Sequence, residues 1–117
     1  MDKLFDAELR LMEIIWERGI ISAKEVSLIA AERFGWNKNT TYTVIKRLVE
    51  KDIVCRDEPG FICSPKLGKA DVQKAETKTL IEKLFGGSRK AFFAAFSDDN
   101  LSADEVEALR ALIEKKD

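Results

Sequence analysis

Two amphipathic helical patterns follow each other in this sequence, with only Gly35 and Trp36 between them. The first pattern opens with Ser22 and Glu25, which have the spacing of a capping box at a helix start, and it ends at Gly35. The second opens at Asn37, a residue type that favours the N-cap position. Two helices joined by so short a turn predict a helix-turn-helix.

The inward faces of three helices follow from the spacing of their apolar residues. A helix expected over residues 6–18, with Asp6 as its N-cap and Gly19 at its end, has the inward stripe Leu9, Met12, Ile15 and Trp16. For the helix that follows Ser22, the inward residues are Val26, Ile29, Ala30 and Phe34. For the helix over residues 37–51, they are Thr41, Val44, Ile45 and Leu48.

Short strands complete this part of the chain. Ile20 and Ile21 are a β-branched pair, long enough for a brief strand. Residues 53–55 and 61–63 flank a polar Asp-Glu-Pro-Gly turn, which predicts a β-hairpin. The resulting order of helix, strand, helix, helix, strand, strand is that of a winged helix-turn-helix. We therefore expect a mainly α fold with a small β-hairpin, and a winged-helix DNA-binding domain over residues 4–65.

Beyond Pro65 the pattern is helical throughout. It predicts a long helix over residues 67–85, a break at Gly86 and Gly87, a short aromatic segment over 91–96, and a last helix that opens with a second capping box at Ser102. A tail this short cannot enclose a core of its own. We expect a helical dimerisation region over residues 66–117, which makes the protein a homodimer. The expected interface residues are Leu80, Ile81, Leu84, Phe85, Phe92, Phe93, Phe96 and Leu109.

The outward face of the 37–51 helix, opposite its predicted core residues, carries two kinds of polar side chain. Short ones, Asn39, Thr40 and Thr43, lie in the first turns, and the cations Lys46 and Arg47 lie further along. Short side chains can approach base edges and thymine methyl groups in the major groove, while long cations reach phosphates. The alternative for the threonines is capping chemistry alone.

Charge is distributed unevenly over a chain whose net charge is −1. Residues 33–56 hold six basic and two acidic side chains, which gives this window +4 and predicts a basic stripe of the kind that binds nucleic acid. The hairpin turn is acidic, so we expect the wing to support the fold, with Arg56 as its phosphate contact. Trp36 either packs or donates to a phosphate. The predicted DNA-binding residues are Trp36, Asn37, Lys38, Asn39, Thr40, Thr43, Lys46, Arg47 and Arg56.

Composition argues against catalysis and metal binding. The sequence has no histidine, the commonest general base and zinc ligand, and its two cysteines cannot complete a four-ligand site. We expect no enzyme activity, no metal site and no cofactor. Cys55 and Cys63 lie on the two predicted hairpin strands, and they are either reduced thiols or a redox pair, because the sequence leaves the register of the hairpin open.

The expected compartment is the cytoplasm. No apolar run approaches the ~20 residues of a membrane span, and the N-terminus lacks the organisation of a signal peptide, so we expect no membrane insertion. The competing functional class is a winged-helix module that binds protein and recognises no operator. The basic stripe and the exposed threonines favour DNA over that alternative.

The chain resembles the penicillinase-repressor family of transcriptional regulators over nearly all of its length. The resemblance rests on residues 8–16, on the pair Gly86-Gly87 and on residues 100–105, which lead into the closing Leu-Arg-Ala-Leu helix. It rests most specifically on Trp36 and the spaced residues that follow it, which are Lys38, Thr40, Thr43, Arg47 and Leu48.

The resemblance implies a homodimeric repressor on a palindromic operator, upstream of resistance genes and often of its own gene. In the antibiotic branch of the family, a membrane-bound sensor protease system leads to cleavage of the tail at an Asn-Phe bond. Ala95 and Phe96 stand at that place here, so either a protease of different specificity cuts this bond or a ligand controls the dimer. The copper-responsive branch has a cysteine-rich C-terminal motif, which residues 114–117 do not contain.

Overall fold

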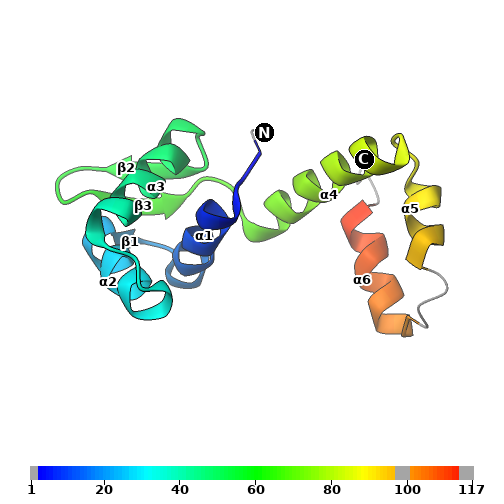
Figure 1. Ribbon diagram of the computed structural model, residues 1–117, viewed down its shortest axis with the longest axis horizontal. Coiled ribbons are helices and arrows are strands. Elements are labelled where there is room, and N and C mark those ends of the chain that lie inside the picture. The colour runs from blue at the N-terminus through cyan, green and yellow to red at the C-terminus, as the bar shows by residue number, and fades with distance from the viewer. Residues whose placement is uncertain (1–2, 97–100, 114–117) are drawn as a thin grey trace. The chain divides into compact units, whose positions relative to one another are not determined.

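The computed structural model describes residues 3–96 and 101–113. The chain forms two compact units, divided between Lys69 and Ala70, which we call the head and the tail. The elements of the head are α1 (Asp6–Arg18), β1 (Ile21–Ser22), α2 (Ala23–Phe34), α3 (Lys38–Glu50), β2 (Val54–Asp57) and β3 (Ile62–Pro65) (Figure 1). The tail holds α4 (Lys69–Phe85), α5 (Arg89–Phe96) and α6 (Ala103–Ile113). The first residue of α4, Lys69, belongs to the head.

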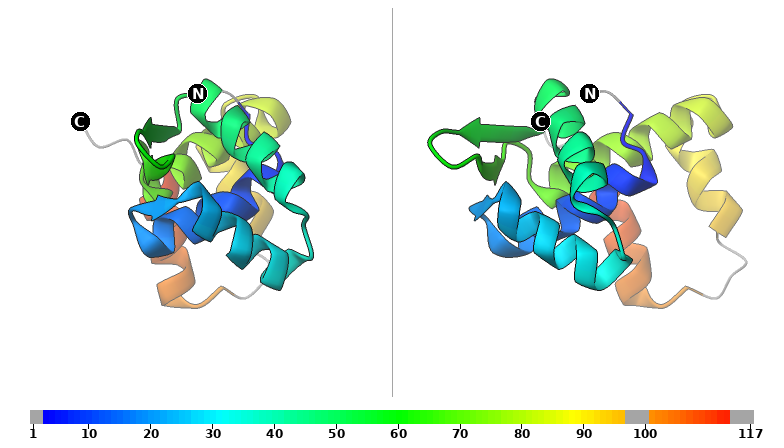
Figure 2. Two further views of the ribbon diagram at one scale, coloured as in Figure 1. Left: turned by 90° about the vertical axis from the view of Figure 1, so that its left-hand side faces the viewer. Right: turned by 60° about the vertical axis from the view of Figure 1, so that its left-hand side comes forward.

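The three strands form one antiparallel sheet in the order β1-β3-β2. β1 pairs with β3 at Ile21 and Cys63, and the loop between β2 and β3 extends to one side of the helices of the head (Figure 2). The mainly α fold, with a winged helix-turn-helix and a small hairpin, is thereby confirmed. No helix in the two described ranges has the length and apolar character that a membrane crossing needs.

The core of the head surrounds α1, which packs against α2, α3 and β3. Because α1 is covered on several sides, its buried face is wider than one stripe. Leu11 and Ile14 are fully buried, whereas Leu9 and Trp16 of the predicted stripe are half-buried, so that stripe was partly wrong. In α2 the buried polar residue is Ser27, and Ile29 and Phe34 are half-buried. All four predicted inward residues of α3 are buried, namely Thr41, Val44, Ile45 and Leu48.

A buried ion pair joins the start of α1 to the end of α3. The prediction of Asp6 as N-cap was wrong, because Phe5 takes that position and its backbone N–H donates to Glu8 Oε1 at 2.8 Å. The same oxygen accepts from Lys51 Nζ at 2.7 Å, and only 1% of the Glu8 side chain is exposed. Lys51 Nζ also donates to the Lys3 carbonyl at 2.7 Å and lies 4.7 Å from the centre of the Phe5 ring. One lysine therefore pairs with the carboxylate through Oε1 and holds the segment before α1, while the buried Glu8 Oε2 has no hydrogen-bond partner among the described residues.

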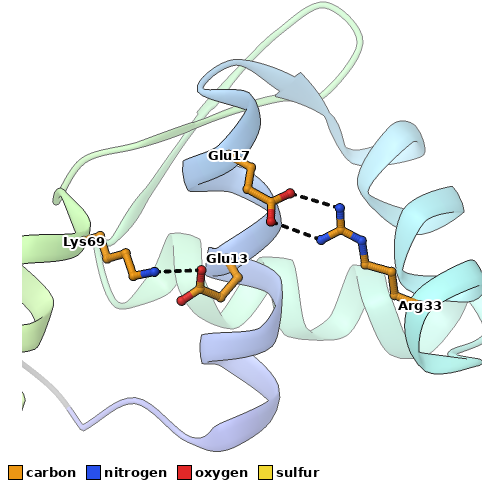
Figure 3. A network of polar contacts seen from close by, with 4 residues as sticks. All are labelled: Glu13, Glu17, Arg33 and Lys69. Atoms are coloured by element: carbon orange, nitrogen blue, oxygen red, sulfur yellow. Dashed lines mark hydrogen bonds and ion pairs between the residues drawn. The ribbon is translucent and has the colours of Figure 1, made fainter.

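Residues 66–69 belong to the head by their contacts, although the predicted boundary lies just before them. The Lys66 N–H donates to the Ile53 carbonyl at 2.8 Å, and Trp16 Nε1 donates to the Leu67 carbonyl at 2.9 Å. Figure 3 shows Lys69 paired with Glu13 of α1 at 3.1 Å. These partners are far away in sequence, so apolar periodicity gives no sign of them.

The register of the hairpin separates its two cysteines. Cys55 lies opposite Ser64 and Cys63 lies opposite Arg56. Because neighbouring residues of a strand point to opposite faces, Cys55 and Cys63 lie on opposite faces of the sheet. Both are free thiols, and burial raises the pKa of Cys63 to about 11. The geometry therefore supports reduced thiols and not a redox pair.

The tail is much more open than the head, since its helices make few mutual contacts. Its main cluster is aromatic: the Phe92 ring centre lies 5.5 Å from that of Phe85 and 5.2 Å from that of Phe96. Ile81 and Phe92 are buried within the single chain. The exposed residues of the predicted interface are Leu80, Leu84 and Phe96, and the half-buried ones are Phe85, Phe93 and Leu109.

The starts and ends of the tail helices follow local signals. The capping box at the start of α6 is confirmed, because Ser102 and Glu105 exchange backbone-to-side-chain hydrogen bonds of 3.1 Å. The predicted aromatic segment is the helix α5, whose first turn is capped by Ser88 Oγ accepting from the Ala91 N–H at 3.0 Å. Ala95 and Phe96 are its last residues, and both are exposed.

Replacing Lys51 by methionine should lower the free energy of unfolding by about 3–5 kcal/mol, because it leaves the buried Glu8 carboxylate without its cation. The double variant Glu8→Leu/Lys51→Met should recover most of that loss, since apolar side chains then fill the space of the pair. Urea denaturation at neutral pH measures both. Lys69→Met is the control, because it breaks an ion pair whose side chains are about half exposed and should change stability little. An equal effect of the two single variants would contradict this account.

Iodoacetamide should modify the folded protein at one cysteine, Cys55. With a pKa of about 11, Cys63 is a thiolate in only about one molecule in a thousand at pH 8, and thiolate is the reactive form. Peptide mass mapping locates the label, and the same reaction in urea should modify both cysteines. Equal labelling of Cys55 and Cys63 in the folded protein would show that Cys63 is accessible and that its pKa is not raised.

Candidate nucleic-acid interface

The start of α3 is set by two local features. Gly35 ends α2 with a φ of 70°, a left-handed conformation that glycine adopts without strain, and its N–H donates to carbonyls in the last turn of that helix. Asn37 then caps α3, its side-chain oxygen accepting from the Thr40 N–H at 2.8 Å. The predicted N-cap is confirmed. These two residues fix where the polar face of α3 begins.

The predicted DNA-reading residues of α3 lie together on its exposed face. Besides Lys38 at its start and Glu50 at its end, the exposed residues of α3 are Asn39, Thr40, Thr43, Lys46 and Arg47. A shallow hollow on this face is lined by Asn37, Asn39, Thr40, Thr43, Val44 and Arg47. The side chains at the first turns of α3 thus border one concave surface with a cation at its far end.

The hydroxyl groups of the threonines are used differently. Thr43 Oγ1 donates to the Asn39 carbonyl at 2.8 Å, one turn earlier. That bond uses the hydroxyl proton, so Thr43 offers its methyl group and its oxygen lone pairs to a ligand. A methyl group suits contact with the thymine methyl, and an oxygen acceptor suits the amino groups of adenine or cytosine. Thr40 is exposed in the first turn, where its backbone N–H is already taken by the cap.

Trp36 packs within the turn that joins α2 and α3. It is half-buried, and its ring centre lies 5.3 Å from that of Phe34. The Arg10 guanidinium lies 5.5 Å from the centre of the same Phe34 ring. Packing, one of the two roles expected for Trp36, is therefore seen in the structure. Its other role, donation to a phosphate, stays a prediction.

Half of the basic residues in the 33–56 window have acidic partners within the head. Arg33 makes a two-pronged contact with Glu17 at 3.0 and 3.3 Å (Figure 3), and this hydrogen-bonded pair lowers the pKa of Glu17 and raises that of Arg33. Lys51 is paired with Glu8, and Arg56 with Glu58 at 2.8 Å. The other three cations are Lys38, Lys46 and Arg47, which form no ion pair within residues 3–96 and 101–113. All three belong to α3.

Arg56 differs from the other predicted DNA-binding residues in its surroundings. It lies on β2, and it does not line the hollow of α3. Its guanidinium lies 3.7 Å from the centre of the Phe61 ring, and the Phe61 ring packs edge-on against Tyr42 of α3 at 5.8 Å. Sequence reasoning missed this link between hairpin and helix. The aromatic residue that directly follows the hairpin turn was its available signal.

The family model described as "Penicillinase repressor" matches residues 4–115 of this chain. Among similar proteins, the penicillinase repressor of Staphylococcus aureus is 30% identical over 110 residues, which cover 92% of this chain and 87% of that protein. The methicillin resistance regulatory protein MecI of Mammaliicoccus sciuri is 28% identical over 117 residues, covering 97% and 95% of the two chains.

Among solved structures, the DNA-binding domain of the repressor BlaI, determined in solution, is similar to this chain with a TM-score of 0.55 and 29% identity. The similarity covers 61% of this chain and 93% of that domain. The family match spans almost the whole sequence and includes both head and tail. This chain belongs to the penicillinase repressor family.

Proposed function

We propose that this protein is a transcriptional repressor that binds a palindromic DNA operator as a homodimer and acts in the cytoplasm. The observation that carries the proposal is the exposed face of α3, where a polar hollow and three cations without recorded acidic partners lie on one helix. The similarity to a domain named as the DNA-binding domain of a repressor supports the same function. Its relatives carry the names of penicillinase and methicillin resistance, so resistance genes are the proposed targets.

In this proposal α3 enters the major groove by its N-terminal end. Thr40 and Thr43 then face base edges, which carry the sequence information. Lys46 and Arg47, one turn further along, reach phosphates on the walls of the groove. The partial positive charge at the N-terminus of α3 adds to this attraction for the backbone. Packing on Phe34 keeps Trp36 beside the start of the helix.

Dimerisation is proposed to occur through the tail. Its helices leave Leu80, Leu84 and Phe96 exposed, and they cover one another poorly. A second copy of the chain buries such surfaces in a closed, two-fold symmetric pair. Two heads then hold two half-sites, so that binding of the first head raises the effective concentration of the second at its half-site. A dimer on the promoter blocks RNA polymerase.

Release from DNA is proposed to act on the same tail. The bond between Ala95 and Phe96 lies at the exposed end of α5, and its cleavage separates α6 from the rest of the chain. Either a protease of a membrane-bound sensor system with a preference other than Asn-Phe cuts there, or a ligand controls the dimer. Both routes weaken the pairing of the heads and leave the core of the head intact.

Replacing Thr40 or Thr43 by valine should weaken binding to the operator by about 1–3 kcal/mol and leave binding to a scrambled duplex nearly unchanged, because these side chains face bases. Fluorescence titration with the operator, located by footprinting the gene's own promoter, measures this. Thr79→Val is the matched control, since Thr79 on α4 is also exposed and its hydroxyl also donates one turn back, to Ala75, at 3.0 Å.

Lys46→Ala and Arg47→Ala should instead weaken binding to operator and scrambled duplex alike. Each lost phosphate contact should flatten the dependence of log affinity on log salt by about 0.9. Equal losses on both duplexes for the threonine variants would place Thr40 and Thr43 on the backbone. A wild-type protein that prefers neither duplex would favour the protein-binding alternative.

Leu84→Glu should convert the protein to a monomer and reduce operator affinity by a factor on the order of 10²–10⁴, the gain that a second linked head supplies. Sedimentation at micromolar concentration measures the oligomeric state. Leu28→Glu on α2 is the control, because Leu28 is 63% exposed and Leu84 is 66% exposed, while only Leu84 lies in the tail. A wild-type monomer, or a Leu84→Glu dimer, would contradict dimerisation through this surface.

A further inference from the structure

Arg56, the cation of the wing, contacts two other side chains of the wing. Arg56 Nε donates to Glu58 Oε1 at 2.8 Å, and its guanidinium lies 3.7 Å from the centre of the Phe61 ring. The other carboxylate oxygen, Glu58 Oε2, accepts from the Phe61 N–H at 3.2 Å. Glu58 therefore binds both the cation and the backbone of the residue on which that cation stacks. We call Arg56, Glu58 and Phe61 the wing clasp.

The wing clasp is linked directly to the helix proposed to read DNA. Phe61 packs edge-on against Tyr42, with ring centres 5.8 Å apart, and Lys38 Nζ lies 5.7 Å from the centre of the Tyr42 ring. Phe61 thus contacts both Arg56 on β2 and Tyr42 in the second turn of α3. A cation at this place is near enough to the DNA-facing helix for its charge to matter to DNA binding.

We propose that Glu58 determines binding specificity by keeping Arg56 from the DNA backbone. A phosphate and the Glu58 carboxylate compete for the same guanidinium, and Glu58 has the advantage of being already in place. Binding to random DNA depends almost entirely on contacts between cations and phosphates. A clasped Arg56 therefore adds little affinity for DNA of any sequence. Discrimination is then left to α3, whose cations lie beside the base-reading side chains.

The electrostatics of the wing agree with this assignment. The hydrogen bond from Arg56, followed by that from the Phe61 backbone, lowers the pKa of Glu58, so its carboxylate is charged at neutral pH. Asp57 adds a second exposed carboxylate next to the clasp. The inference rests on the proposed function, because it assumes that α3 binds DNA.

The test compares Glu58→Gln with Asp57→Asn in the full-length protein. Both variants remove one exposed negative charge from the wing, but only the first removes the charged partner of Arg56. Glutamine keeps an oxygen that can accept from the Phe61 N–H, so the turn retains its shape. The probes are a random-sequence duplex and the promoter duplex, titrated between 50 and 200 mM salt.

Glu58→Gln should bind the random duplex more tightly than wild type, with a salt dependence steeper by about 0.9 in log–log slope, because one more phosphate contact is made. Over that salt range the added slope is about a further threefold loss of affinity. The preference for the promoter duplex should fall. Asp57→Asn should change the slope much less, and a change equal to that of Glu58→Gln would overturn the inference.

The Arg56→Gln background decides whether the effect of Glu58 acts through Arg56. Arg56→Gln alone should bind random DNA as wild type does, and Glu58→Gln should cause no steepening in this background. A persistent steepening, or a flatter slope for Arg56→Gln alone, would overturn the inference, because Arg56 would then be dispensable or already bound to DNA. If the wild-type protein does not prefer the promoter duplex, the proposed function itself fails. This result differs from a persistent steepening or a flatter Arg56→Gln slope, which would overturn only the inference about Glu58.

Discussion

The buried ion pair between Glu8 and Lys51 joins two helices of the head that are far apart in sequence. It connects the first turn of α1 to the residue that caps the C-terminus of α3, so the helix that carries the polar face is fixed at both ends. Asn37 sets its start and Lys51 its end. A buried carboxylate with a single cation is costly to break, and any shift of α3 along its axis breaks it.

The helices and the exposed face of α3 could be predicted because their causes are local. Ser22, Asn37 and Ser102 each cap a helix within three residues of themselves, and each cap is present in the structure. The spacing of Thr41, Val44, Ile45 and Leu48 fixes which side of α3 is buried, and therefore which side remains for a ligand. The two short apolar runs on either side of a polar turn predicted the hairpin from local sequence in the same way.

The features that the sequence did not predict depend on residues that are far apart or on register. Glu8 lies outside the predicted apolar stripe of α1, and only its partner, 43 residues later, explains why it is buried. The separation of Cys55 from Cys63 depends on how β2 aligns with β3, which a turn motif alone does not determine. Arg56 has the right charge to bind a phosphate, but it is paired with Glu58, an exposed acid on the turn, two residues later.

The pairing of basic residues in the 33–56 window has a consequence for how such a protein searches a chromosome. Half of those cations already have acidic partners, and those without recorded ones lie on α3. A repressor meets a vast excess of sites that are not its operator, and each extra phosphate contact lengthens its stay at every one of them. A surface with few available cations shortens those stays. Fewer molecules per cell are then enough to keep a promoter occupied.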